Sequence, residues 1–166
     1  MKYVYDNNNL SVVDNPLPKV YITNAYIIAK NGSESLDFLT KESMDPKVAV
    51  VESDNPNFVT KKNTPEISTA KIEIYKPNYV RITTHALFDG ILVLTDTNFP
   101  GWEAYVNGQK SSIYFANYLF RGIRLTAGTN IVEFKYQPAY LNTAFLLSGI
   151  TIFMVLFLSA KKLLMR

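Results

Sequence analysis

Four side chains in the second half of the chain carry groups that sugar-binding sites use. Trp102 follows Pro100-Gly101 and could pack its indole face against a pyranose ring. Asp96, Asn117 and Arg121 could hydrogen-bond sugar hydroxyls. Arginine also suits phosphate, because its planar guanidinium donates two parallel hydrogen bonds. We therefore take Trp102, Asp96, Asn117 and Arg121 as candidate glycan-binding residues.

Each candidate also has an ordinary structural explanation. Trp102 could be a core residue that fixes the turn before it, and Arg121 could be a surface arginine paired with a carboxylate. Arg124 lies three positions after Arg121 in a predicted strand, so these two side chains should point to opposite faces. At most one of the two arginines can then face a common site.

The sequence predicts no catalytic residue and no metal site. Asp96, Glu103 and Glu133 are the acidic residues nearest Trp102, but their spacing does not indicate the pair of carboxylates, about 5 to 9.5 Å apart, that glycosidases use. The chain has no cysteine and a single histidine, His85, which argues against thiolate chemistry and a histidine metal centre. We expect no cofactor in this portion.

Alternating apolar residues and turn signals predict that antiparallel strands position the candidates. A continuous apolar run at 91–96 is typical of a central strand buried on both faces, and Asn107-Gly108 predicts a two-residue hairpin turn. Strands recur about every ten residues from 66 to 138, which predicts a mostly β fold of the antiparallel β-sandwich or jelly-roll type. The other predicted strands are 19–30, 47–52, 70–75, 80–83, 103–106, 113–118, 120–125 and 131–136.

We expect residues 1–138 to form one β-rich domain, with 1–65 as a leading α+β segment and 66–138 as the sandwich core. Within the leading segment, 33–42 has early acidic residues and a leucine face, which predicts one short helix with Ser33 as its N-cap. Asparagines and prolines predict a loop at 53–65.

A long apolar segment closes the chain. Residues 139–160 contain no charge, and a helix of this length spans roughly 30 Å, the hydrocarbon thickness of a bilayer. A buried core helix is the alternative, but a domain this small could hardly bury a helix that is apolar on every side. We therefore predict a single transmembrane helix at 139–160, followed by a basic tail at 161–166.

The charge of the chain is concentrated in that tail. The net charge is +3, and Lys161, Lys162 and Arg166 follow the apolar segment, so the preceding segment is neutral. A neutral domain lends no support to nucleic-acid binding. The positive-inside rule places the tail in the cytoplasm and the β-domain outside it. Because no hydrophobic signal region precedes the domain, we expect a longer polytopic protein of which this is the end; a tail-anchored protein with a cytoplasmic domain is the alternative.

An ordered series of short segments runs through nearly the whole chain. These segments are 15–21, 45–52, 90–96, 99–108, 116–117, 120–123, 127–128 and 132–138. Together with the final helix, the series resembles the C-terminal ectodomain of the bacterial YfhO-type membrane proteins. Where that family often has Asp-Gly in the hairpin, this chain has Asn107-Gly108, which serves the same type I′ turn.

The resemblance implies a function for a much longer polytopic protein. The family is similar to GT-C glycosyltransferases, which use polyprenyl-phosphate sugar donors, and is linked to glycosylation of cell-envelope polymers such as lipoteichoic acid. The implied catalytic acidic residues would lie on early extracytoplasmic loops, so this portion would position substrate or serve structurally. The implied partners are the bilayer, the upstream transmembrane helices and an envelope glycopolymer. A stand-alone membrane-anchored module that binds glycan or protein is the alternative.

Overall fold

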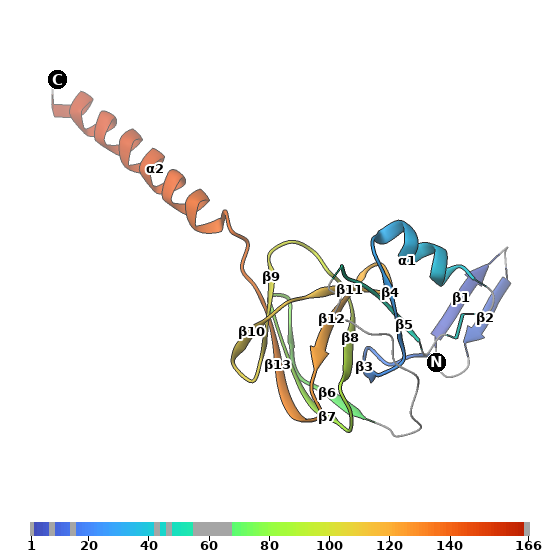
Figure 1. The fold of residues 1–166 in the computed structure, drawn as a ribbon. Helices are drawn as coiled ribbons and strands as arrows, with labels where there is room; N and C mark the ends of the chain where they lie inside the picture. The colour runs from blue at the N-terminus through green and yellow to red at the C-terminus, as the bar shows by residue number, and fades with distance from the viewer. Residues whose placement is uncertain are drawn as a thin grey trace.

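The computed structural model describes residues 2–6, 9–13, 16–41, 44–45, 48–54 and 68–164. Two β-sheets pack face to face, and a long helix leaves the domain at its C-terminal end (Figure 1). A separate antiparallel hairpin, β1 (Lys2–Asp6) with β2 (Asn9–Val13), lies at the N-terminus. The prediction of a mostly β fold with one short helix and one apolar C-terminal helix is confirmed. The predicted loop at 53–65 falls largely outside the described residues.

One sheet is antiparallel throughout and has the order β10-β9-β13-β7-β6. Its strands are β6 (Thr69–Lys76), β7 (Tyr79–Ala86), β9 (Trp102–Val106), β10 (Gln109–Ser111) and β13 (Gly128–Tyr136). The hairpin between β9 and β10 turns at Asn107 and Gly108, whose φ angles are 51° and 80°. Positive φ at both central positions is the type I′ turn that these two residue types favour, so the predicted hairpin is confirmed.

The second sheet has the order β3-β8-β12-β11-β5-β4. Its strands are β3 (Val20–Thr23), β4 (Tyr26–Ala29), β5 (Ala49–Glu52), β8 (Gly90–Thr97), β11 (Tyr114–Ala116) and β12 (Phe120–Leu125). All its pairs are antiparallel except β4 with β5, which are parallel and are connected through α1 (Gly32–Leu39). The sandwich was predicted as antiparallel, and this βαβ unit is its one departure among the described strands.

The predicted single strand at 19–30 is wrong, because Asn24 and Ala25 divide it into β3 and β4 at opposite edges of the second sheet. The edges of a flat six-stranded sheet would lie roughly 24 Å apart. A two-residue connection spans at most about 11 Å. The second sheet must therefore curl until its two edges approach each other.

The curled sheet buries both of its faces, and β8 lies between the two resulting cores. Leu92 and Leu94 of β8 belong to the core between the sheets, whereas Ile91 and Val93 belong to the core inside the curl. These four side chains are fully buried, so the prediction that this strand is covered on both faces is confirmed. The core between the sheets also contains Val80, Ile82, Ala104, Ile123, Leu125, Val132 and Phe134.

The N-cap of helix α1 lies two residues earlier than predicted. Its N-cap is Asn31, not Ser33: the Asn31 Oδ1 accepts a hydrogen bond from the backbone of Glu34 at 3.0 Å. The Glu34 carboxylate in turn accepts from the backbone of Lys30 at 2.7 Å. Asparagine caps helices as well as serine does. Asn31, unlike Ser33, is followed three positions later by an acidic residue, whose carboxylate accepts a hydrogen bond from the backbone just before the helix.

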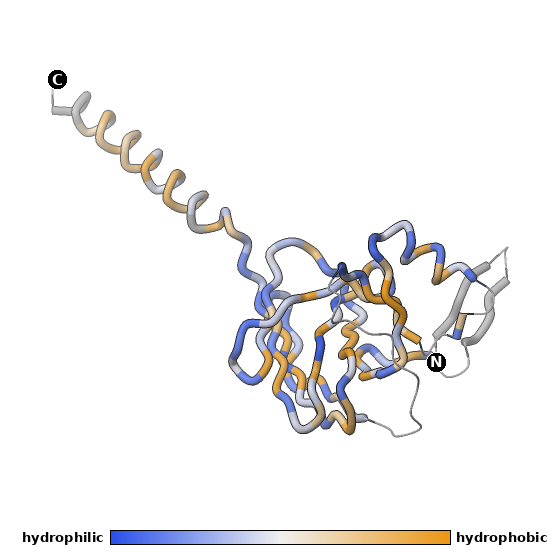
Figure 2. Tube along the Cα trace, in the orientation of Figure 1, coloured by the Kyte–Doolittle hydropathy of each residue, from blue (hydrophilic) through white to orange (hydrophobic). Residues whose placement is uncertain are grey.

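Helix α2 (Leu141–Leu164) projects away from the domain (Figure 1). Its window Thr143–Ala160 has a mean hydropathy of 2.2, and none of that window is buried inside the domain. The alternative of a buried core helix is therefore wrong. Apolar residues run along the helix in Figure 2, and its 24 residues extend about 36 Å, enough to cross a bilayer.

Candidate functional site

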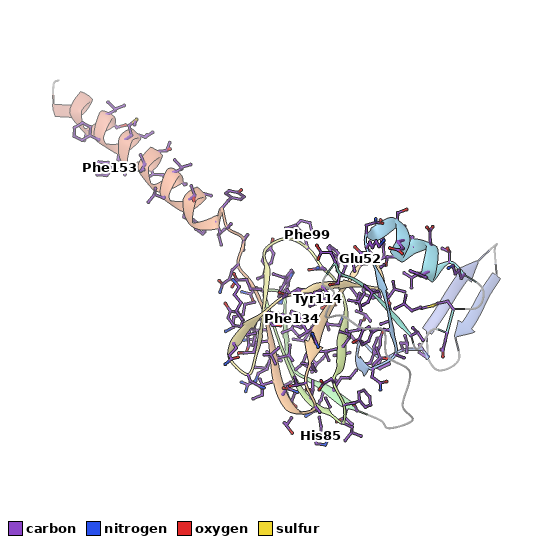
Figure 3. All side chains as sticks on the ribbon, viewed as in Figure 1. Glu52, His85, Phe99, Tyr114, Phe134 and Phe153 are labelled. Atoms are coloured by element: carbon purple, nitrogen blue, oxygen red, sulfur yellow. The ribbon has the colours of Figure 1, made fainter. Side chains whose placement is uncertain are left out.

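The candidate site lies at the end of the sandwich from which the chain enters α2. Strand β13 ends at Tyr136, and the backbone N–H of Gln137 donates to the carbonyl of Gly101 at 2.6 Å. Gly101 has a φ of +103°, and a Cβ there would lie 2.9 Å from the Tyr136 ring. Glycine is therefore needed for the loop at 98–101 to approach the exit to α2. Figure 3 shows Phe99 at this end and His85 at the opposite end.

We call these two ends the helix-proximal end and the distal end. The helix-proximal end comprises the turn at 77–78, the loop at 98–101, the turn at 117–119 and Tyr136. The distal end comprises the turns at 87–89 and 126–127.

Arg121 is buried between the two sheets beneath Trp102. Its side chain is only 5% exposed, and its guanidinium carbon lies 3.8 Å from the centroid of the Trp102 ring system and 5.4 Å from that of Phe134. Its Nε donates to the carbonyl oxygen of Thr97 at 3.1 Å. Burial lowers the pKa of Arg121 from its ordinary value, although a guanidinium stays protonated in proteins. The interpretation of Arg121 as a surface arginine is therefore wrong.

The stacked pair of Arg121 and Trp102 is part of the core at this end. Trp102 is partly buried and packs on the core between the sheets, with the Tyr136 ring 5.3 Å from its own. Arg124 is exposed, so the two arginines do point to opposite faces as the spacing predicted. Trp102 thus has a structural role, and its edge also lines the clefts described below.

Asp96 lies at the end of β8 among three donors. Lys19 Nζ lies 2.9 Å from one carboxylate oxygen, and the hydroxyl of Tyr75 is 3.1 Å from both. Nη2 of Arg121 is 3.9 Å from the carboxylate. Hydrogen bonding to Tyr75 and Asp96 raises the pKa of Lys19 above its ordinary value. The Asp96 carboxylate therefore lies between two cations, Lys19 and Arg121.

Asp96, Tyr75, Trp102 and Arg121 line an open cleft of about 700 Å³. The residues lining it are Tyr75, Lys76, Pro77, Val80, Asp96, Thr97, Phe99, Trp102 and Arg121. A second cleft, of about 370 Å³, lies on the other side of Phe99 and Trp102, and Glu103 and Lys110 are among its lining residues. The first cleft combines aromatic side chains with a carboxylate and a lysine, and its volume is in the range of small-ligand sites.

The structure brings Asp96, Trp102 and Arg121 together but places Asn117 elsewhere. Asn117 has a φ of 48°, its Oδ1 accepts from the backbone of Val50 at 2.8 Å, and its Nδ2 donates to the hydroxyl of Tyr21 at 3.2 Å. It therefore joins the turn after β11 to β5 and β3.

Tyr75, which lines the cleft, and Lys19, which pairs with Asp96, were not predicted. Tyr75 is exposed at the end of a strand whose alternation did place it on the polar face, which was a weak signal. Nothing in the local sequence points to Lys19, which lies 77 residues before Asp96.

The other acidic residues near Trp102 have partners of their own. Lys110 Nζ lies 2.6 Å from Glu103, and the Tyr105 hydroxyl donates to the same carboxylate at 2.8 Å. These two hydrogen bonds lower the pKa of Glu103, whereas a glycosidase general acid needs a raised one. Glu133 accepts from the hydroxyl of Tyr79. Among the described residues, no three acidic or histidine side chains come close enough to hold a metal ion.

Comparison with known proteins gives two matches. The family model described as bacterial membrane protein YfhO matches residues 9–148. The uncharacterized protein YfhO of Bacillus subtilis (strain 168) is 28% identical over 109 residues. That stretch is 64% of this chain but 13% of the relative, so the chain corresponds to a small part of the relative's length. No solved structure matches this chain.

Proposed function

The chain belongs to the YfhO family of bacterial membrane proteins, and from that premise we propose that it is the C-terminal part of a polytopic protein similar to GT-C glycosyltransferases. In this proposal the full-length protein uses a polyprenyl-phosphate sugar donor and glycosylates a cell-envelope polymer such as lipoteichoic acid. The β-domain lies outside the cytoplasm, does not carry the catalytic residues, and positions the glycan substrate.

The observation that carries the positioning role is the cleft at the helix-proximal end. Tyr75, Phe99 and Trp102 offer aromatic surface to a sugar ring, and Asp96 offers carboxylate oxygens to its hydroxyls. Because Gln137 is bonded to Gly101, this cleft is also close to the segment that enters α2. A polymer held there would be near the membrane, where the proposed upstream helices would perform the transfer.

The orientation rests on the basic tail and is tested by labelling. The chain has no cysteine, so single-cysteine variants report one position each within it. We expect a membrane-impermeant maleimide to label Lys71→Cys, on exposed β6, in intact cells, and to label Lys162→Cys only after permeabilisation. The opposite pattern would place the domain in the cytoplasm, as a tail-anchored protein would have it.

The substrate role is tested in the full-length protein with two matched aspartates. Asp96→Asn removes the carboxylate charge of the cleft, whereas Asp89→Asn changes an aspartate that accepts from the backbone of Ala127 at the distal end. We expect Asp96→Asn to lower the sugar content of the extracted envelope polymer about tenfold. A tenfold change corresponds to about 1.4 kcal/mol, which is about the contribution of one hydrogen bond to a charged group. Asp89→Asn should leave it unchanged at equal protein level.

Equal polymer glycosylation in both variants would contradict substrate positioning by this cleft. If the chain alone nevertheless bound glycans, the alternative of a membrane-anchored binding module would take its place.

A further inference from the structure

Apolar side chains gather on the outer surface of the helix-proximal end. Phe99 is 61% exposed, Leu119 is 48% exposed, and Phe115 and Tyr75 are also exposed. The backbone N–H of Asn98 donates to the carbonyl of Leu119 at 2.7 Å, which brings the two loops side by side. Phe99 shares one cleft with Phe115 and the other with Tyr75. We call Tyr75, Phe99, Phe115 and Leu119 the aromatic rim.

Exposed apolar side chains clustered in this way mark a surface that contacts something apolar. At the distal end, by contrast, Leu87 is 44% exposed. Among the described residues of the two turns at that end, no other large apolar side chain is exposed. A single exposed leucine is normal on a soluble surface. The clustering is thus a property of the helix-proximal end.

The chain itself places the aromatic rim next to α2. Phe99 is two residues from Gly101, whose carbonyl accepts from the backbone of Gln137. Only three residues separate Gln137 from Leu141, the first residue of α2, a distance of at most about 15 Å along the chain. Tyr140, between them, is 83% exposed, and tyrosine at the end of an apolar helix is typical of the membrane–water interface.

The charges around the aromatic rim are compatible with a lipid surface. The two carboxylates that line the clefts beside it, Asp96 and Glu103, each have a lysine within 3 Å, Lys19 and Lys110 respectively. These two clefts therefore present little uncompensated negative charge to the headgroups. Lys76, exposed at the end of β6, adds a cation, and lysine beside aromatic side chains favours anionic lipid surfaces.

We propose that the helix-proximal end rests on the bilayer from which α2 emerges, with the side chains of Phe99 and Leu119 in the headgroup layer. The domain is then held by two contacts, the helix and the aromatic rim, and the cleft beside Phe99 opens at the membrane surface. This inference rests on α2 crossing the membrane and is independent of whether the cleft binds a glycan.

Fluorescence quenching tests the proposal at three matched positions. The chain has no cysteine, so Phe99→Cys, Leu119→Cys and the distal control Leu87→Cys can each carry one environment-sensitive NBD probe. The whole chain is reconstituted into vesicles of phosphatidylcholine and phosphatidylglycerol with or without nitroxide-labelled lipid. Because all three side chains are exposed, none of the substitutions opens a cavity in the core.

We expect nitroxide lipid to quench the probes at 99 and 119 at least threefold more strongly than the probe at 87. Equal, weak quenching at all three positions would overturn the proposal. So would blue-shifted emission at 99 and 119 without quenching by lipid, because the aromatic rim would then be covered by protein. Neither result would bear on polymer glycosylation, which depends on Asp96.

Discussion

The helix-proximal and distal ends of the sandwich are built from the same strands but use their polar side chains differently. At the distal end, the buried Asn130 donates to the carbonyls of Thr126 at 3.0 Å and Gly128 at 3.3 Å. Asp89 there accepts from the backbone of Ala127 at 2.9 Å. At the helix-proximal end, Asp96 and Trp102 line an open cleft of about 700 Å³, which is larger than the cleft of about 400 Å³ that Thr126 and Asn130 line at the distal end.

This difference separates turn-stabilising residues from candidate binding residues. A polar side chain that satisfies backbone groups in its own turn has a structural role and little capacity left for a ligand. Among the described residues, the contacts of the Asp96 carboxylate are with the side chains of Lys19, Tyr75 and, at 3.9 Å, Arg121. None of these contacts supports a turn. The comparison therefore favours the helix-proximal end as the site of function and the distal end as a structural closure.

The largest effect should come from glycine substitutions at the two ends. Gly101→Ala places a Cβ 2.9 Å from the Tyr136 ring at a φ of +103°, whereas Gly128→Ala, at +116°, meets nothing within 4 Å. We expect Gly101→Ala to cost about 3 kcal/mol of unfolding free energy, from backbone strain plus overpacking, and Gly128→Ala about 1 kcal/mol, from strain alone. Urea unfolding of the two variants measures both. Equal losses would show that the loop at 98–101 does not depend on its contact with Tyr136.

A smaller effect is expected from Arg121→Met. The Nη1 of Arg121 is buried without a hydrogen-bond partner, and replacing a buried charge by an apolar side chain of similar volume is often nearly neutral. Asp96 would keep Lys19 and Tyr75. We expect the unfolding free energy to change by no more than about 1 kcal/mol, the size of the cation–π contact with Trp102.

The exposed Arg124→Met is the control for that substitution and should be within about 0.5 kcal/mol of the unmodified chain. A loss of about 3 kcal/mol or more in Arg121→Met would mean that the buried cation supports the helix-proximal end more strongly than its contacts indicate.

The smallest effect is a pH dependence at the helix-proximal end. Lys110 and Tyr105 lower the pKa of Glu103 below its ordinary value of 4.5. A carboxylate with a lowered pKa in the folded state contributes stability that is present above pH 4.5 and is lost as the pH falls through the folded-state pKa. The stability difference between the unmodified chain and Glu103→Gln should therefore be small at pH 6 and shrink towards pH 3. A difference that grew on acidification would contradict this assignment.

Local features of the fold could be predicted from the sequence. The apolar run in β8, the Asn107-Gly108 turn and the apolar α2 each depend on residues that are close together in the chain. The break of the predicted strand at Asn24 and Ala25 could not be predicted in this way, because it depends on the curl of a six-stranded sheet. Asn31 was missed as N-cap because Ser33 has the same local preference.

The candidate site was predictable only in part, because some of its contacts also depend on how the strands are arranged in the sheets. Asp96 and Trp102 are six residues apart and flank one loop, so a shared site followed from the strands on either side. Tyr75 and Lys19 lie beside Asp96 because of the order of the strands in the sheets. Asn117 lies away from the site because its side chain is hydrogen-bonded to Val50 and Tyr21. Contacts between residues this far apart in sequence are set by topology rather than by local pattern.

The most direct test of the account uses Trp102, the only tryptophan of the chain, as its own probe. The chain in lipid nanodiscs is titrated with glucose, galactose and N-acetylglucosamine oligosaccharides while its fluorescence is recorded. We predict a saturable change with at least one of these sugars, weakened about tenfold by Asp96→Asn and unaffected by Asp89→Asn at the distal end. Fluorescence that stays constant to millimolar sugar, or a response that both variants alter equally, would contradict glycan binding at the helix-proximal end.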